Sequence, residues 1–233
     1  MDFNFFLWPI LIPMILPLYY CIKFKKESLK DVVYLIIIMV IIVFLYWPFL
    51  SINFLSSYTY IIVKIILFCI LPISFLLIFK RDKSIINLKN FGLGKKGFKK
   101  SILLFISFVP IMLFFTFIIK YLDATAYESN ILFGITSFFE SFTEEFFFRG
   151  ILFIFLLSKT NIRIAYLTSL TTFILMHPQH FQNYSNLFFI STIIQGFLTT
   201  EIARRSENIT GAWLLHGTNR FFITAIIPLL IYI

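Results

Sequence analysis

Long apolar runs alternate with short polar breaks along the whole chain. A helix that spans a membrane needs about 20 mostly apolar residues, and eight runs approach that length. They cover residues 3–22, 32–52, 59–79, 101–119, 131–158, 164–177, 187–203 and 209–232. The breaks are too short for a separate soluble domain. The pattern predicts an all-α fold, a polytopic membrane helix bundle of about eight transmembrane helices in one domain over residues 1–233.

Composition and charge placement agree with this prediction. The chain is 60% hydrophobic and 13% charged, whereas soluble domains have about 25% charged residues. Lysines and arginines follow the first, third, fifth and seventh runs, and the other three breaks contain only Lys120. Because short cytoplasmic loops are rich in basic residues, these four breaks are predicted to be cytoplasmic and both termini outside.

The same basic breaks account for the net charge of +9. They predict attraction to anionic membrane lipid, and no nucleic-acid partner is expected. A composition rich in Ile, Phe, Lys and Asn favours a bacterial plasma membrane as the location. The oligomeric state is left open.

Ionisable residues inside the predicted spans are costly, so each is a candidate functional group. Two have simpler interpretations. Lys64 lies near the outer end of the third run, where its ammonium is expected to reach the interface. Glu201 lies four residues before Arg205 and is expected to pair with it.

The other ionisable residues fall in "SFTEEFFFRG", "TTFILMHPQH" and "TGAWLLHGTNRF". Counting inward from the nearest basic break at 1.5 Å per residue puts Glu144, His177 and Arg220 at a depth of about 21 to 22 Å. His216 comes out at about 16 Å. Because groups from three spans share one layer, the sequence predicts a single buried site in the outer half of the membrane.

Helical spacing separates the two adjacent glutamates of the first stretch. Glu145 and Arg149 are four residues apart and are predicted to form a buried ion pair. Glu144 lies about 100° further round the helix and is free to point into the site. Glu140, one turn earlier, is either a second carboxylate behind Glu144 or a residue at the outer rim.

The histidines of the second stretch differ in their predicted roles. Phe173 and His177 share a helix face, and Pro178 favours a helix end at His177. An imidazole at a helix end beside a cavity is suited to proton transfer; the alternative for His177 is an interfacial histidine in contact with outer water. His180 is expected at the wet interface.

The first two stretches carry motifs of the CPBP family of intramembrane proteases, which the chain resembles over roughly residues 131–233. The family includes CAAX prenyl endopeptidases and bacterial relatives linked to bacteriocin maturation, immunity and peptide signalling. Its motif E-E-x-x-x-R matches Glu144, Glu145 and Arg149, and its motif F-x-x-x-H matches Phe173 and His177.

The third family motif, H-x-x-x-N, matches only in part. His216 fits, but Arg220 stands at the asparagine position and Asn219 lies one residue early. The resemblance implies that Glu144 and His177 activate a water molecule, and that His216, with Asn219 or Arg220, stabilises the oxyanion. It implies an intramembrane endopeptidase that hydrolyses a peptide bond of a membrane-associated or lipidated protein or peptide.

The sequence leaves the role of a metal open. Glu144, His177 and His216 are a two-histidine, one-carboxylate set of the kind that holds catalytic zinc. No H-E-x-x-H spacing supports such a site. We expect no obligatory cofactor, with one divalent metal such as zinc as the alternative.

Two other functions also fit buried carboxylates and histidines. A proton-coupled transporter would place them in one layer, although inverted repeats and broken helices are missing from the pattern. A catalytically silent membrane scaffold or regulator of the same family would fit the change from asparagine to Arg220.

Overall fold

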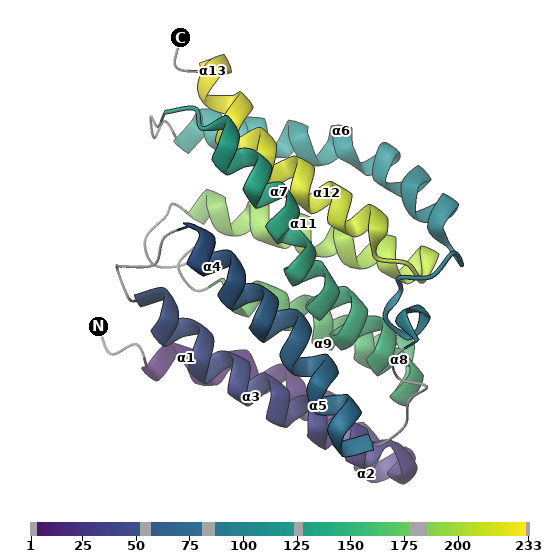
Figure 1. Ribbon diagram of the computed structural model, residues 1–233. Coiled ribbons are helices and arrows are strands. Elements are labelled where there is room, and N and C mark those ends of the chain that lie inside the picture. Colours follow the sequence, from purple (N-terminus) through teal and green to yellow (C-terminus); the bar gives the residue numbers. More distant parts are fainter. Residues whose placement is uncertain (1–3, 52–56, 81–86, 124–127, 178–185, 232–233) are drawn as a thin grey trace.

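The computed structural model describes residues 4–51, 57–80, 87–123, 128–177 and 186–231. Within these residues every regular element is helical, and consecutive segments join into long rods (Figure 1). The first three rods are α1 (Asn4–Leu11), η1 (Ile12–Met14) and α2 (Ile15–Phe24); α3 (Leu29–Ser51); and α4 (Ser57–Lys64), η3 (Ile65–Ile70) and α5 (Leu71–Lys80). The short turns η2 (Lys26–Ser28) and η5 (Leu88–Phe91) lie in the first and third breaks.

The remaining rods are α6 (Phe98–Asp123); α7 (Ile131–Glu145), η6 (Phe146–Phe155) and α8 (Leu156–Lys159); α9 (Ile162–Leu175); α11 (Asn186–Ser206); and α12 (Thr210–Phe221), η7 (Phe222–Ile226) and α13 (Ile227–Ile231). Each described rod coincides with one predicted apolar run to within a few residues. The all-α bundle predicted from the sequence is confirmed.

Side-chain caps fix two of the helix starts. The side chain of Asn130 accepts a hydrogen bond from the backbone N–H of Phe133 at 2.8 Å, and Asn161 does the same for Ile164 at 3.0 Å. Such caps satisfy backbone donors that the first helical turn leaves unpaired. They explain why the rods that carry the first two motifs begin where they do.

Four described helices are long and apolar enough to cross a membrane: Lys26–Tyr46, Thr59–Phe79, Phe98–Asp123 and Thr210–Ile231. Trp8–Phe24 and Ile162–Leu175 are apolar but shorter. The protein is an integral membrane helix bundle. The rods that carry the first and second motifs are among those outside this group of four, because they contain more polar residues or are short.

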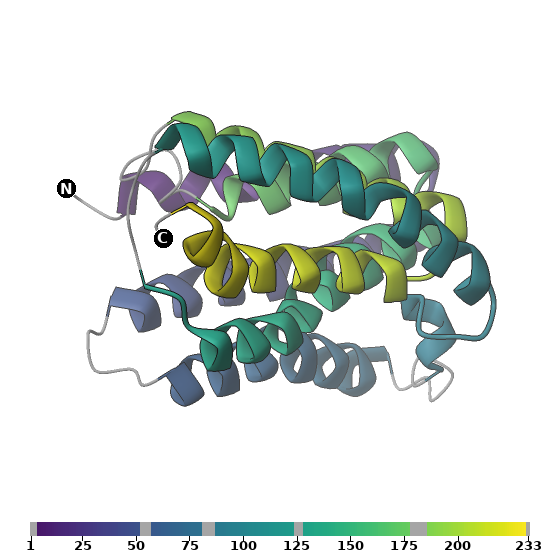
Figure 2. The same cartoon turned by 90° about the horizontal axis from the view of Figure 1, so that it is seen from above.

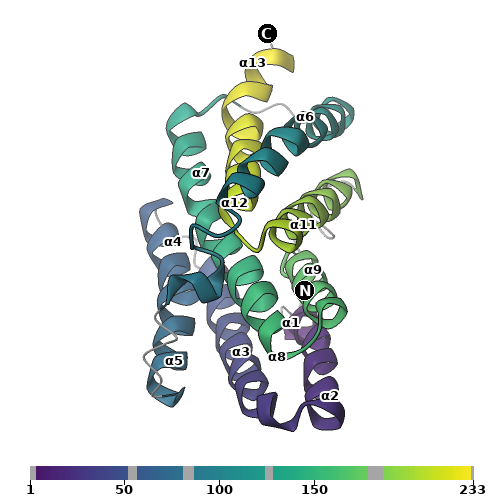
Figure 3. The ribbon, with the colours of Figure 1, turned by 90° about the vertical axis from the view of Figure 1, so that its right-hand side faces the viewer.

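The rod that begins at α12 is the centre of the packing. It contacts α7, α6 and α11, and Figure 3 shows it between α7 and α11. A Cβ atom at Gly217 would lie 2.8 Å from the backbone oxygen of Phe138, and one at Gly211 would lie 2.1 Å from that of Ser101. These two glycines therefore permit the close approach of α12 to its neighbours.

The basic breaks meet in pairs at the end of the bundle away from the two termini (Figure 2). Lys159 Nζ lies 2.9 Å from Asp31 Oδ2, which joins the fifth break to the start of α3. Asn208 Nδ2 donates to the backbone oxygen of Gly94 at 2.8 Å, which joins the seventh break to the third. The contacts place the basic breaks at a common end, as their alternation requires.

Candidate active site

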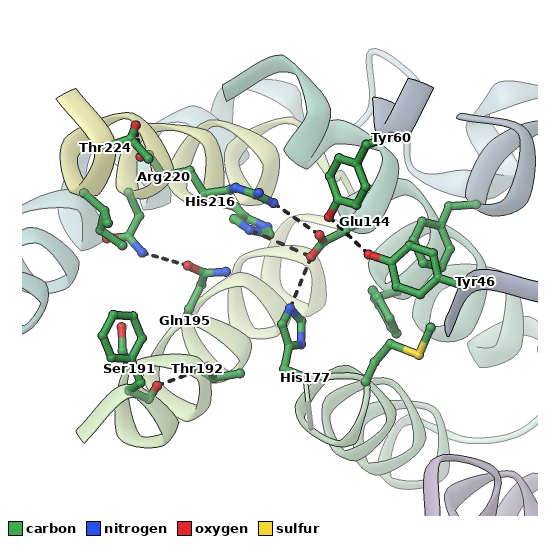
Figure 4. A pocket seen from close by; sticks show the side chains of 16 residues that line it. Tyr46, Tyr60, Glu144, His177, Ser191, Thr192, Gln195, His216, Arg220 and Thr224 are labelled. Atoms are coloured by element: carbon green, nitrogen blue, oxygen red, sulfur yellow. Dashed lines mark hydrogen bonds and ion pairs between the residues drawn. The ribbon is translucent and has the colours of Figure 1, made fainter. Parts of the chain in front are cut away.

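Side chains from six rods enclose one cavity of about 250 Å³. Figure 4 shows Glu144, His177 and His216 meeting in it, so one residue from each sequence motif reaches the same space. The wall on α11 is polar. Its lining residues there are Ser191, Thr192 and Gln195, with Phe188 one turn earlier.

Glu144 presents one carboxylate oxygen to both histidines. Its Oε2 atom lies 3.6 Å from His177 Nε2 and 3.9 Å from His216 Nε2. Both separations exceed a direct hydrogen bond. Oε2 is buried and has no hydrogen-bond partner among the residues that the structure describes. The three atoms therefore surround a position suited to a bridging oxygen.

The other ring nitrogen of each histidine is fixed. His177 Nδ1 lies 2.8 Å from the backbone oxygen of Phe173, and a carbonyl only accepts, so Nδ1 carries the proton. His216 Nδ1 lies 2.8 Å from Glu145 Oε1, where a carboxylate fixes the same tautomer. In the neutral imidazoles both Nε2 atoms are consequently acceptors that face the cavity.

The predicted ion pair between Glu145 and Arg149 is confirmed, at 3.2 Å between Oε2 and Nε with both side chains fully buried. Arg149 also donates to Gly196 O at 3.1 Å and to Thr199 Oγ1. The sequence does not predict the bond between His216 and Glu145. Helical spacing shows which residues share a face of one helix, but not which neighbouring helix that face contacts. Glu145 thus ties α12 to the rod that holds Glu144.

The prediction that Lys64 reaches the interface is wrong. Lys64 is 0% exposed, and its ammonium bridges Glu140 and Glu144. The rim alternative for Glu140 is excluded as well, since it is 3% exposed. The physical reason is that α4 packs against α7, which turns Lys64 towards two carboxylates instead of water.

Arg220 belongs to the same group of charges. Its Nη1 atom lies 2.9 Å from Glu140 Oε2 and 3.3 Å from Glu144 Oε1. The cations Lys64 and Arg220 therefore both approach Oε1 of Glu144 and leave Oε2 to the histidines. Burial alone does not set the chemistry of this carboxylate, because two neighbouring cations favour its ionised form.

Three carboxylates and three cations meet in this layer, so their formal charges cancel when the imidazoles are neutral. The members are Glu140, Glu144, Glu145, Lys64, Arg149 and Arg220. A divalent metal at Glu144 would add two positive charges next to the buried Lys64 and the partly buried Arg220, which is costly. In the described ranges no group of three His, Cys, Asp or Glu side chains is arranged to hold a metal. The charge balance of these residues therefore disfavours a divalent metal at Glu144.

Asn219 faces away from this charge cluster. It is 2% exposed, its Oδ1 accepts from Thr116 Oγ1 at 2.7 Å, and its Nδ2 donates to Gln195 Oε1 at 2.8 Å. Sequence reasoning missed Thr116 and Gln195. Gln195 carries the one signal that could have found it, a carboxamide in the middle of a predicted span.

Two tyrosines outside the motif region complete the wall. The hydroxyls of Tyr46 and Tyr60 lie 3.2 Å apart, beside Lys64.

The expected pair of Glu201 with Arg205 is confirmed at 2.5 Å. His180 lies outside the described residues.

Comparison with known proteins supports the motif assignment. No curated protein and no solved structure matches the chain. Residues 126–222 match the family described as type II CAAX prenyl endopeptidase, Rce1-like. This range contains every residue of the three motifs, and over it the chain is similar to the Rce1-like family.

Proposed function

We propose that the protein is an intramembrane endopeptidase that hydrolyses a peptide bond of a membrane-associated or lipidated protein or peptide. The observation that carries this proposal is the buried Oε2 of Glu144, which lies 3.6 and 3.9 Å from two imidazole nitrogens in the cavity. The family match agrees with protease chemistry. Because that family consists of prenyl endopeptidases, a prenylated peptide is the first substrate to test.

In the proposed mechanism, Glu144 Oε2 and His177 Nε2 accept the two hydrogens of one water molecule. The water oxygen bonds to the peptide carbonyl carbon while one proton passes to Glu144. The carbonyl oxygen becomes an oxyanion, which needs a hydrogen-bond donor from the cavity wall; a His216 ring that takes up a second proton would supply one. The carbon–nitrogen bond then breaks, and the proton on Glu144 passes to the leaving nitrogen.

The charge balance supports a reaction without an obligatory metal. The water-binding position is bounded by one ionised carboxylate and one imidazole acceptor, and these two groups can orient the water on their own. Lys64 and Arg220 favour the ionised form of Glu144, so its carboxylate can hold and orient the water molecule.

The cavity occupies the half of the bundle nearer the termini, and we propose that this half faces outward in a bacterial plasma membrane. The shared end of the basic breaks supports this orientation. Labelling of intact cells with an impermeant thiol reagent tests it, using Ser185→Cys and Ser84→Cys. We expect labelling at position 185 only, and labelling at position 84 alone would reverse the topology.

The function is tested with purified protein in detergent and a quenched fluorescent peptide that ends in a prenylated CAAX sequence. The same peptide without the prenyl group is the control substrate. We expect cleavage by the parent protein and loss of at least about 100-fold in Glu144→Gln, the range for a general base. Saturable binding without cleavage would instead support the silent scaffold, and equal cleavage by both proteins would refute the role of Glu144.

A further inference from the structure

We propose that Gln195 Nε2 donates a hydrogen bond to the oxyanion, and that Asn219 and Thr116 position it. This inference rests on the proposed endopeptidase function. It assigns a catalytic role to a residue on α11, outside the three motifs. It also accounts for the loss of asparagine at position 220.

The candidate donors on α12 are already engaged. The Arg220 guanidinium lies 2.9 Å from Glu140 and 3.3 Å from Glu144, so it serves the carboxylates. His216 Nδ1 is bonded to Glu145, and its Nε2 donates only when the ring carries a second proton. Asn219 donates to Gln195. The site therefore needs a neutral donor that is available before any proton moves.

The chain of hydrogen bonds from α6 orients the Gln195 carboxamide. The Thr116 hydroxyl donates to Asn219 Oδ1 at 2.7 Å, which turns Asn219 Nδ2 towards Gln195 Oε1 at 2.8 Å. Because Oε1 is held on that side, Nε2 must point the other way. Asn219 and Thr116 are each at most 2% exposed, so the chain is shielded from competing water.

Gln195 Nε2 points into the cavity. Figure 4 shows the nitrogen of its amide on the side nearer Glu144 and His177, with the oxygen turned away from them. Gln195, Glu144, His177 and His216 line the same space. Within the described part of the chain, the side-chain hydrogen bond of Gln195 is the one that its Oε1 accepts from Asn219. If the carbonyl carbon of a bound substrate lies next to the water position, its developing oxyanion can accept a hydrogen bond from Gln195 Nε2.

The test compares kcat and KM of the parent with those of Gln195→Met, which keeps the side-chain length and removes the donor. Loss of one oxyanion donor lowers kcat by about 100- to 1,000-fold. We expect that loss in Gln195→Met with KM within about twofold, since the bond forms with the intermediate and not with the bound peptide. If the parent is active and Gln195→Met folds with the same kcat, the proposal is overturned.

Thr116→Val tests the positioning chain, because valine has the same shape and no hydroxyl. We expect kcat to fall by about three- to tenfold, the range of one neutral hydrogen bond. In the double variant with Gln195→Met, kcat should fall no further than in Gln195→Met alone, because Thr116 acts through Gln195. Additive losses would show that Thr116 is structural only. Thr200→Val is the matched control, since Thr200 is buried on α11 and bonds its own helix at Gly196 O, 2.6 Å away.

A second measurement does not depend on turnover. A peptide that carries a tetrahedral phosphonate in place of the scissile amide imitates the intermediate. Gln195→Met should bind it about 100-fold more weakly than the parent does, and the matched amide peptide equally well. A parent that neither cleaves the prenylated peptide nor binds its phosphonate refutes the proposed function, and this inference with it. A parent that does both, with an unchanged Gln195→Met, refutes the inference alone.

Discussion

Arg220 Nη1 lies 2.9 Å from Glu140 Oε2. The residue at the family's asparagine position is thus paired with a carboxylate one helical turn before Glu144. If Glu140 were apolar, Arg220 would keep only its longer contact of 3.3 Å with Glu144. The departure from the family motif is therefore balanced within this chain, and the pair can be tested as a unit.

Replacing Arg220 alone should destabilise the protein. Breaking a buried ion pair costs about 3 to 5 kcal/mol, and the partial exposure of Arg220 favours the lower end. We expect Arg220→Asn to melt well below the parent in detergent, and Arg220→Asn with Glu140→Gln to recover much of the loss, because the second change removes the excess negative charge that remains beside Lys64. A double variant that melts below both single variants would contradict this coupling.

Lys64 should behave as a structural cation despite its position near a helix end. Lys64→Met leaves Glu140 and Glu144 with Arg220 as their shared cation, so the melting temperature should fall by several degrees and activity should fall with it. Lys96→Met is the control. Lys96 pairs with Glu207 at 2.5 Å, but its side chain is 81% exposed, and such pairs contribute at most about 1 kcal/mol. Equal melting temperatures of Lys64→Met and Lys96→Met would show that Lys64 is exposed to solvent like Lys96.

The difference between these lysines shows where reasoning from the sequence ends. Contacts within one helix could be predicted, as for Glu145 with Arg149, because helical spacing fixes them. Contacts between helices could not, because they depend on which faces pack. Lys64 was therefore assigned to the interface, and its bonds to α7 were missed.

The predicted depth of the site was informative but coarse. Glu144 and Arg220 were assigned the same depth, and they do interact, at 3.3 Å. His216 was placed about 6 Å lower at 1.5 Å per residue, yet its ring reaches both Glu144 and Glu145. Side-chain length and helix tilt make up that difference. Thr116 and Gln195 gave only a weak signal, because uncharged polar residues are common in spans.

Metal content follows from the charge balance of the buried layer. Protein purified without added metal should contain less than about a tenth of a metal ion per chain and keep its activity after dialysis against a chelator. Elemental analysis and cleavage of the prenylated peptide measure the two properties. The opposite result would be one zinc ion per chain, with zinc and activity both lost on chelation and both restored when zinc is added. It would show that at least one of the three carboxylates binds zinc and does not only pair with the three cations.

The adjacent glutamates Glu144 and Glu145 should differ in what their loss removes. Glu145 bonds Arg149 at 3.2 Å and His216 at 2.8 Å, so Glu145→Gln leaves a buried guanidinium without its anion. We expect a loss of about 3 to 5 kcal/mol, with cleavage falling as a consequence of unfolding. Melting in detergent and protein abundance in membranes measure it.

Glu144→Gln should lose cleavage with a smaller loss of stability, because Glu140 still neutralises part of the charge on Lys64 and Arg220. The amide keeps the size of the side chain but cannot take a proton from water, so the variant should still bind the phosphonate peptide. Its melting temperature should lie between those of the parent and Glu145→Gln. If Glu145→Gln stayed folded and inactive while Glu144→Gln unfolded, the base would be Glu145 and the assignment of the two carboxylates would be reversed.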